Sequence, residues 1–322
     1  MAAVASWLEA PVQVRVPATS ANLGPGFDAF GLALGLHDLV TAQVTDGGLR
    51  IEVAGPGAAA AASGERHLVV RAMRAAFDQL GEQPPGLRLR CENAIPQGYG
   101  LGSSAAAIMA GLLAARALAG QQGADRLPDA ALLRLATELE GHADNVAACR
   151  DGGFTIAWTA TGSVRSLRLD PLPELIPTLC LPAAPLATQA ARQLLPAMVP
   201  HAEAAQTAAR AALLVTALTR DPSLLLDATQ DYLHQPYRLS AMPISADLLR
   251  ALRAAGVPAV VSGAGPAVLA LVVPGTTAGP DIVSAVAAAS GEEWQVSVLE
   301  VDRAGGTVLG LGLAPASRKS AA

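Results

Sequence analysis

Lysine is almost absent from this chain of 322 residues, since its single lysine is Lys319. A Walker A loop needs a lysine after its glycines, a protein kinase needs one on a strand beside the phosphates, and a Schiff-base enzyme needs a buried amine. No glycine-rich or apolar segment of the chain supplies that lysine. Any phosphate or carboxylate chemistry must therefore use arginine, backbone N–H groups or a metal ion.

Aromatic residues, cysteine and positive charge are scarce too. Aromatic residues make up 3% of the chain and hydrophobic residues 52%, so the core must be built from Leu, Val, Ile and Ala, which favours helices packed closely on a sheet. The chain has three cysteines, Cys91, Cys149 and Cys180, and no two of them form a C-x-x-C motif. This indicates buried thiols in a reducing compartment rather than disulfides or a structural zinc site. A net charge of -5 gives no basic surface, so we expect no nucleic-acid partner.

A basic N-terminal region and a long uninterrupted hydrophobic run are also missing. The longest apolar stretch, 259–273, is broken by Ser262, Gly263, Gly265 and Pro266. We therefore expect no signal peptide, no membrane partner and a cytoplasmic location. The length predicts roughly two domains.

The first half of the chain alternates between strand-like and helix-like patterns. Residues 39–53 alternate on both sides of Asp46-Gly47-Gly48, which predicts a β-hairpin. The polar segment 17–31 is predicted to be a structured loop. The other predicted strands are 12–16, 87–91, 152–158 and 164–169, and the predicted helices are 68–80, 105–118 and 130–141.

A shift in composition at Asp170-Pro171-Leu172-Pro173 predicts a domain boundary, which gives domains 1–170 and 171–322. Strand and helix patterns continue to alternate after it, so the whole chain is predicted to be a two-domain α+β or α/β protein. The predicted strands are 176–181, 259–262, 267–273 and 294–300, and the predicted helices are 187–195, 202–219, 223–233, 245–255 and 281–290.

The segment 96–104, Pro-Gln-Gly-Tyr-Gly-Leu-Gly-Ser-Ser, connects a predicted strand to an alanine-rich helix. Its N–H groups and the helix N-terminus point to the same place, which is typical of an anion site. Ser103 or Ser104 can cap the helix and offer a hydroxyl to a phosphate or to Mg2+. Ser103 stands where a dinucleotide-binding fingerprint has its last glycine, which argues against that motif. A plain glycine-rich turn is the alternative.

Other polar groups lie in loops and in the second half of the chain. The loop 17–28 has the composition of a site lining, and Asp28 could hold a substrate ammonium there; local backbone bonding is the alternative. The turn Gly263-Ala264-Gly265-Pro266 is either a tight connection between two strands or a second backbone clamp, that is, a segment whose backbone faces the glycine-rich loop 96–104. Arg192 and Arg238 are candidates to bind a substrate carboxylate through two hydrogen bonds each, although isolated arginines usually extend from a helix edge into water.

The segment 138–145 gathers Glu138, Glu140, His142, Asp144 and Asn145 at a helix end. This pattern predicts a magnesium carboxylate together with groups that orient a substrate; a solvated helix end is the alternative. Glu138 and Glu140 cannot both face one site on a continuous helix, because residues i and i+2 diverge. His142 is favoured near a helix C-terminus by the dipole alone.

Three of these segments together resemble the GHMP small-molecule kinases: Pro17 to Asp28, Pro96 to Ala106 with its Gly-Leu-Gly-Ser-Ser, and Ser262 to Pro266. The middle segment is shared across that superfamily and marks ATP phosphate binding without a lysine. The first segment resembles the homoserine kinases in particular. Glu140 to Asn145, and Arg192 before Leu-Leu-Pro, extend the resemblance over nearly the whole chain.

The resemblance implies ATP-dependent phosphorylation of the L-homoserine hydroxyl, for threonine biosynthesis, by a homodimer. It implies an α+β fold with an N-terminal domain like domain 2 of ribosomal protein S5 and a ferredoxin-like C-terminal domain. It implies the following site residues: Asn22 and Asp28 for the substrate amino end, Arg192 and Arg238 for its carboxylate, Asn145 and His142 as catalytic groups, and Ser104 with Glu138, or secondly Glu140, for Mg2+. The implied ATP-binding residues are Pro96, Gln97, Gly98, Tyr99, Gly100, Leu101, Gly102, Ser103, Ser104, Ala105, Ala106, Gly263 and Gly265.

Two departures from the family pattern are Gln189, where the family often has lysine, and Ala264, where it often has serine; we expect both to be tolerated. The rival hypotheses are a kinase for another small alcohol such as mevalonate or a sugar, a non-catalytic nucleotide-binding regulator, and a dinucleotide oxidoreductase. A substrate with both an ammonium and a carboxylate would match Asp28 with Arg192 and Arg238, which favours homoserine.

Overall fold

The computed structural model describes residues 7–61, 63–186, 192–276 and 278–309. Its larger sheet follows the order β11-β1-β2-β4-β3, with β5 paired to the other end of β2, and β6 paired to β5. The long strand β2 therefore joins the two parts of this sheet. The strands are β1 (Val12–Ala21), β2 (Phe30–Thr45), β3 (Gly48–Ala54), β4 (Gly86–Glu92), β5 (Phe154–Ala160), β6 (Ser163–Leu169) and β11 (Thr307–Leu309).

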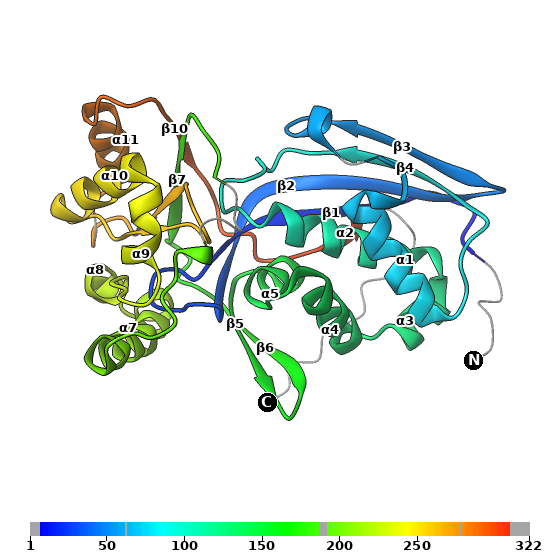
Figure 1. The fold of residues 1–322 in the computed structure, drawn as a ribbon, viewed down its shortest axis with the longest axis horizontal. Coiled ribbons are helices and arrows are strands. Elements are labelled where there is room, and N and C mark those ends of the chain that lie inside the picture. Colours follow the sequence, from blue (N-terminus) through cyan, green and yellow to red (C-terminus); the bar gives the residue numbers. More distant parts are fainter. Residues whose placement is uncertain (1–6, 62, 187–191, 277, 310–322) are drawn as a thin grey trace.

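Helices cover one face of the larger sheet (Figure 1). They are α1 (Leu68–Leu80), α2 (Ser103–Leu118), α3 (Gly120–Arg126), α4 (Asp129–Glu140) and α5 (Asp144–Asp151), with short 3-10 turns at Ala58–Ala60 and Gly64–Arg66. Helix α2 is buried along most of its length between α1 and the sheet. Its alanines allow this close packing, and Gly111 has no side chain where the Val69 carbonyl of α1 approaches. Because its core side chains are small rather than aromatic, the chain can pack these helices and strands close together.

The smaller sheet is antiparallel and has the order β10-β7-β9-β8. Its strands are β7 (Ile176–Pro182), β8 (Ala259–Val261), β9 (Val268–Val272) and β10 (Trp294–Val298). The second half of the chain also contains α7 (His201–Thr219), η3 (Pro222–Leu224), α8 (Leu225–Ala228), α9 (Gln235–Arg238), η4 (Leu239–Ala241), α10 (Pro243–Ala254) and α11 (Pro280–Ala289). Helices α10 and α11 share a separate apolar core with this sheet.

The two halves of the chain are not independent in space. Leu214 of α7 and Val260 of β8 belong to the same apolar cluster as the larger sheet. After β10 the chain returns to the larger sheet, where β11 pairs antiparallel with β1. The division at residue 170 stays a prediction, but a second domain running to residue 322 would include this returning strand.

The predicted hairpin at residues 39–53 is wrong. The chain does turn at Asp46 and Gly47, but β2 and β3 do not pair, because β4 lies between them, antiparallel to β2 and parallel to β3. The apolar side of β4 is fully buried, whereas β3 alternates between half-buried and exposed positions. The strand with more apolar area to bury therefore takes the inner position.

Other boundaries also differ from expectation. Strand β1 continues to Ala21, past Pro17, with a bulge after that proline, so the predicted loop 17–31 is reduced to 22–29. The predicted helix 223–233 is only the short turns η3 and α8, after which the chain is irregular up to α9. Helix α5 was not expected at all. Of the predicted helix 187–195, residues 187–191 lie outside the described residues.

The cysteines agree with the sequence interpretation, since Cys91, Cys149 and Cys180 are free and buried. Burial raises the pKa of the Cys91 and Cys180 thiols to about 12. Among the described helices, none combines the length and the apolar character needed to cross a bilayer.

Gly111→Ala is expected to destabilise the protein, although alanine is the better helix former. A Cβ atom at this position would lie 2.4 Å from the Val69 carbonyl oxygen and 2.8 Å from the Ala72 Cβ, so α1 must shift away from α2. We expect a loss of about 1–3 kcal/mol in the free energy of unfolding, measured by urea denaturation. Gly47→Ala is the control, because nothing lies within 4 Å of its Cβ position, and it should change stability by less than about 0.5 kcal/mol. Equal effects of the two substitutions would contradict this account of the packing.

Candidate functional site

Three segments that are far apart in the sequence meet at one end of the larger sheet. The backbone N–H of Thr19 donates to the Leu101 carbonyl at 3.0 Å, which joins β1 to the glycine-rich loop. The Ser262 hydroxyl donates to the Gly100 carbonyl at 2.8 Å, which joins that loop to the turn between β8 and β9. The turn 263–266 therefore lies against the glycine-rich loop, as its interpretation as a second clamp requires.

The glycines of this loop are needed for the contact. A Cβ atom on Gly100 would lie 2.0 Å from the Ser262 carbonyl oxygen, and one on Gly102 would lie 2.0 Å from the Thr19 hydroxyl oxygen. Both residues have positive φ, at 77° and 65°. The loop is thus held in one conformation by β1 and by the turn after β8.

Helix α2 begins directly after this loop, at Ser103, with Gly102 as its N-cap and no side chain capping it. The sequence suggested that Ser103 or Ser104 caps the helix, but the Ser104 hydroxyl is instead bonded to a glutamate. Within the part of the chain that the structure describes, no side chain accepts a hydrogen bond from the first N–H groups of this sixteen-residue helix. This arrangement suits an anion.

A cavity of about 240 Å³ lies beside the N-terminus of α2. Burial lowers the pKa of His67, one of its lining residues, which favours the neutral imidazole. Sequence patterns did not indicate Arg66, His67 or Asn93, because the adjacent pair Arg66-His67 and the distant Asn93 belong to no common motif. The polar lining residues are Asp38, Arg66, His67, Asn93, Gln97, Ser103 and Ser104, and the apolar ones are Val16, Ala61, Leu68, Val69, Ala106, Ala107 and Ala110.

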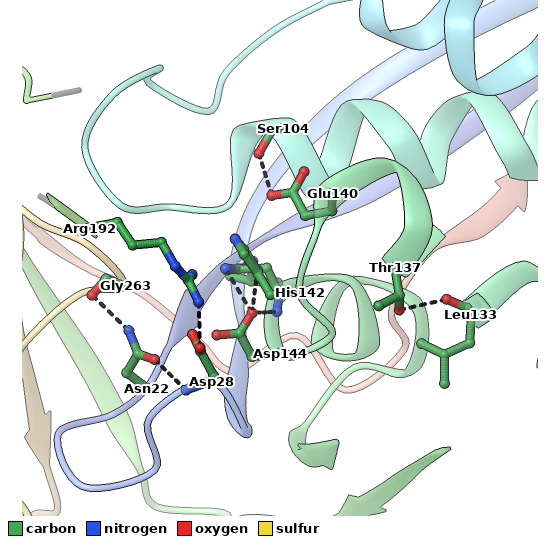
Figure 2. Close-up of polar contacts among 12 residues, drawn as sticks. Asn22, Asp28, Ser104, Leu133, Thr137, Glu140, His142, Asp144, Arg192 and Gly263 are labelled. Carbon is green, nitrogen blue, oxygen red and sulfur yellow. Dashed lines mark hydrogen bonds and ion pairs between the residues drawn. The ribbon is translucent and has the colours of Figure 1, made fainter. Parts of the chain in front are cut away.

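The structure places Glu140, rather than Glu138, next to the start of α2. The Ser104 hydroxyl lies 2.5 Å from Glu140 Oε1 (Figure 2). Glu138 is exposed and pairs with Arg134 at 2.7 Å on the outer side of α4. Burial raises the pKa of Glu140, and the Ser104 hydrogen bond and the charge of His142 oppose this shift.

Acidic and basic side chains meet below this point (Figure 2). Arg192 Nη2 lies 2.6 Å from Asp28 Oδ2, and both side chains are partly exposed, at 45% and 35%. Burial lowers the pKa of Arg238, while the charge of Asp28 raises it and that of Arg192 lowers it. The three predicted ion-binding residues of the substrate site therefore lie close enough to act on one another. Gln189 lies outside the described residues.

Arg238 is almost completely buried, with 2% of its surface exposed. Its Nη1 donates to the Gly263 carbonyl at 3.1 Å and contacts His234 Nδ1 at 3.3 Å. Its Nε has no partner among the described residues. A buried guanidinium with an unused donor is suited to a bound carboxylate. His234 was not indicated by the sequence analysis.

Asn22 supports the loop that carries Asp28. Its Nδ2 donates to the Gly263 carbonyl at 2.9 Å, and its Oδ1 accepts the Asp28 N–H at 2.9 Å. Asn22 and Asp28 both have positive φ, at 68° and 55°. In the described structure the Asn22 amide is thus occupied by the backbone, and Asp28 supplies the carboxylate of this loop, which is paired with Arg192.

The amide of Asn145 is oriented by its neighbours at the start of α5. The Thr19 hydroxyl donates to Asn145 Oδ1 at 2.8 Å, and Asn145 Nδ2 lies 3.4 Å from Asp144 Oδ1. A Cβ atom on Gly102 would lie 2.9 Å from the same Oδ1, so this amide is next to the glycine-rich loop. Because Oδ1 is already engaged, Asn145 can offer an N–H donor to a ligand but is not a free acceptor.

His142 lies beside Asn145 and is bonded to the same carboxylate. Its Nδ1 lies 2.8 Å from Asp144 Oδ1. This hydrogen bond raises the pKa of His142, and the charges of Asp144, Glu140 and Asp28 act in the same direction, against the effect of burial. The ring is thus favoured in its protonated form as a hydrogen-bond donor.

The chain is similar to proteins of one kinase family along nearly all of its length. Family models described as GHMP kinases N terminal domain and GHMP kinases C terminal match residues 67–153 and 205–291. A homoserine kinase of Streptomyces coelicolor is 55% identical over 305 residues, which cover 95% of this chain and 96% of that protein. A homoserine kinase of Clavibacter michiganensis is 47% identical over 300 residues, covering 92% and 93%.

A solved structure agrees with these sequence matches. The crystal structure of homoserine kinase from Cytophaga hutchinsonii matches with a TM-score of 0.81 at 28% identity, covering 93% of this chain and 97% of that one. The predicted α+β fold of the GHMP kinases is therefore confirmed.

The contribution of His142 to stability is expected to depend on pH. Its pKa in the folded state lies above the ordinary value of 6.5, so the stabilisation is complete below that value and is lost as the pH rises through the folded-state pKa. His142→Gln should therefore lower the free energy of unfolding more at about pH 6 than at about pH 9, as measured by urea denaturation.

His67→Gln is the matched control, because burial lowers the pKa of His67. Wild type should lose stability relative to this variant as the pH falls below about 6.5, since the unfolded state then binds the proton more readily. The same pH trend in both variants would contradict the assignment of the His142–Asp144 pair.

Proposed function

The chain belongs to the homoserine kinases of the GHMP kinase family, and we propose that it transfers the γ-phosphoryl group of ATP to the side-chain hydroxyl of L-homoserine. The products are O-phospho-L-homoserine, an intermediate of threonine biosynthesis, and ADP. The observation that carries the proposal is a single site in which an uncapped helix N-terminus adjoins one carboxylate and two arginines.

ATP is assigned to the cavity beside α2. The N-terminus of α2 and the glycine-rich loop supply N–H donors for the phosphates, which replaces the absent lysine. The cavity next to them contains neutral and apolar groups, among them Asn93, Gln97, His67 and three alanines of α2, which suit a nucleoside. The two parts are continuous, because Ser103 and Ser104 line the cavity as well as begin the helix.

Mg2+ is assigned to Ser104 and Glu140. Magnesium prefers hydroxyl and carboxylate oxygens and takes few protein ligands when phosphates and water complete its shell. The 2.5 Å contact between these side chains brings the two oxygen donors together, and Glu140 Oε2 makes no hydrogen bond to any described residue. The charge of Mg2+ would neutralise the phosphate oxygens.

Homoserine is assigned to Asp28, Arg192 and Arg238. Its ammonium fits the Asp28 carboxylate, and its carboxylate fits the two guanidinium groups. The ion pair between Asp28 and Arg192 is partly exposed and contributes about 0–1 kcal/mol, so a zwitterion can replace it at little cost. Mevalonate and sugars lack the ammonium, which disfavours them here.

The site works through orientation rather than through a strong base. Asn145 Nδ2 is the donor that can orient the homoserine hydroxyl, because Thr19 holds the amide oxygen. His142 Nδ1 is bonded to Asp144, and the raised pKa of His142 favours the protonated ring, which has no lone pair with which to accept the hydroxyl proton. The hydroxyl oxygen forms the new bond to the γ-phosphorus as the bond to the β,γ-bridging oxygen breaks, and the hydroxyl proton goes to the transferred phosphoryl group. A loose transition state requires positioning and charge neutralisation more than deprotonation.

The direct test is ADP release by the purified protein with Mg-ATP and each of five acceptors: homoserine, threonine, serine, mevalonate and galactose. We expect homoserine to give the highest kcat/KM. Turnover of mevalonate or galactose without turnover of homoserine would overturn the proposal. ATP binding with no acceptor-dependent turnover would instead favour a nucleotide-binding regulator.

Glu140→Gln should raise the Mg2+ concentration needed for half-maximal rate by about 10- to 100-fold, because a neutral amide is a poorer magnesium ligand. Glu138→Gln is the matched control, two residues away on the same helix but paired with Arg134 outside the site, and should leave that concentration unchanged. A larger effect of the Glu138 variant would contradict this assignment and indicate that Glu138, the first choice from the sequence, binds Mg2+.

A further inference from the structure

His234 is completely buried, directly before α9, and makes polar contacts through both ring nitrogens. Its Nε2 lies 2.8 Å from the Gly24 carbonyl oxygen and 3.4 Å from Asp231 Oδ2. Both of these atoms are acceptors, so Nε2 must carry a hydrogen. Its Nδ1 lies 3.3 Å from Arg238 Nη1, which can only donate, so Nδ1 must be the acceptor. The contacts thus require the neutral ring with its hydrogen on Nε2.

The electrostatic surroundings agree with a neutral ring. Burial lowers the pKa of His234, and the charge of Arg238 acts in the same direction. The charges of Asp231 and Asp28 and the hydrogen bond to Gly24 oppose this shift. A proton on Nδ1 would point at the guanidinium, which has no lone pair to accept it.

The position of the ring is fixed from several sides. His234 stacks on Phe27, with 5.2 Å between the ring centroids and 22° between the planes. Asp231 accepts the backbone N–H groups of Leu233, His234 and Gln235 and so holds the start of α9. The imidazole therefore links the loop after β1 to the helix that carries Arg238.

This contact determines which edge of the Arg238 guanidinium is free. Nη1 is shared between His234 Nδ1 and the Gly263 carbonyl. Nε has no partner among the described residues, and no hydrogen bond from Nη2 to a described residue is present. The remaining donors, Nε and Nη2, lie on one edge of the planar group and can bind a carboxylate through both of its oxygens.

We propose that His234 is a positioning residue that holds Nη1 of Arg238 and so directs the Nε and Nη2 edge to the α-carboxylate of the amino-acid substrate. This inference rests on the proposed function, because it takes Arg238 as a ligand of the homoserine carboxylate. According to this inference, His234 contributes to the preference of the enzyme for phosphoryl-acceptor substrates that bear a carboxylate. His234 itself contacts no substrate.

Two substitutions separate the two nitrogens of the ring. His234→Asn keeps an acceptor at the distance of Nδ1 and loses the donor to Gly24, whereas His234→Gln keeps a donor at the distance of Nε2 and loses the acceptor for Arg238. We expect H234Q to raise the KM for homoserine by about 10- to 100-fold, with the KM for ATP unchanged. H234N should keep the homoserine KM within about threefold of the wild-type value. Equal increases in the two variants, or an increase for ATP as well, would overturn the proposal.

A measurement on the wild-type protein tests the same point without a variant. In a histidine-labelled sample, long-range proton–nitrogen spectra report the tautomer of each of the five histidines. We expect one buried ring to remain neutral with its hydrogen on Nε2 at about pH 6. An imidazolium, or a hydrogen on Nδ1, at His234 would overturn the proposal.

The outcomes also distinguish this inference from the proposed function. Absence of homoserine turnover by the wild-type protein would refute the proposed function, whatever the tautomer of His234. Normal turnover in wild type with an unchanged homoserine KM in H234Q would leave the proposed function in place and remove only the role of His234.

Discussion

The carbonyl of Gly263 is the contact on which the site depends. It accepts a hydrogen bond from the Asn22 amide and another from the Arg238 guanidinium, and all three groups are buried. A buried donor without an acceptor costs about 1–3 kcal/mol, and more for a charged group. The loop after β1, the turn after β8 and the short helix α9 must therefore keep their relative positions, and two of these segments carry Asp28 and Arg238, the proposed ligands of homoserine.

The same site is rich in positioned donors and poor in available bases. Thr19 engages the oxygen of Asn145, and Asp144 engages Nδ1 of His142, so both side chains act as donors. Arginine suits this environment better than lysine, because a buried guanidinium stays charged and offers several donors in fixed directions, whereas a buried ammonium tends to lose its proton. The near-absence of lysine is thus compatible with phosphoryl transfer through backbone N–H groups, arginine and a metal ion.

Short-range patterns predicted a large part of this arrangement. Helix α1 has the predicted bounds, because its apolar residues recur at helical spacing and Gly81 follows in the left-handed conformation that ends a helix. The glycine-rich loop and the turn at Gly263 were recognised because their residue types are unusual in any other setting. Motif resemblance then joined these separate segments into one expected site, although it could not say which atoms would meet there.

The sequence by itself determined most of the elements, the motifs and the family, because these depend on neighbours along the chain and on residue types at fixed spacing; it missed helix α5. Tertiary structure alone decided that β4 separates β2 from β3, since strand order depends on which apolar face is buried most completely. It also decided that Glu140 faces Ser104 while Glu138 pairs with Arg134. His234 carries no sequence signal, because its meaning comes entirely from contacts with residues distant in the chain, such as Gly24.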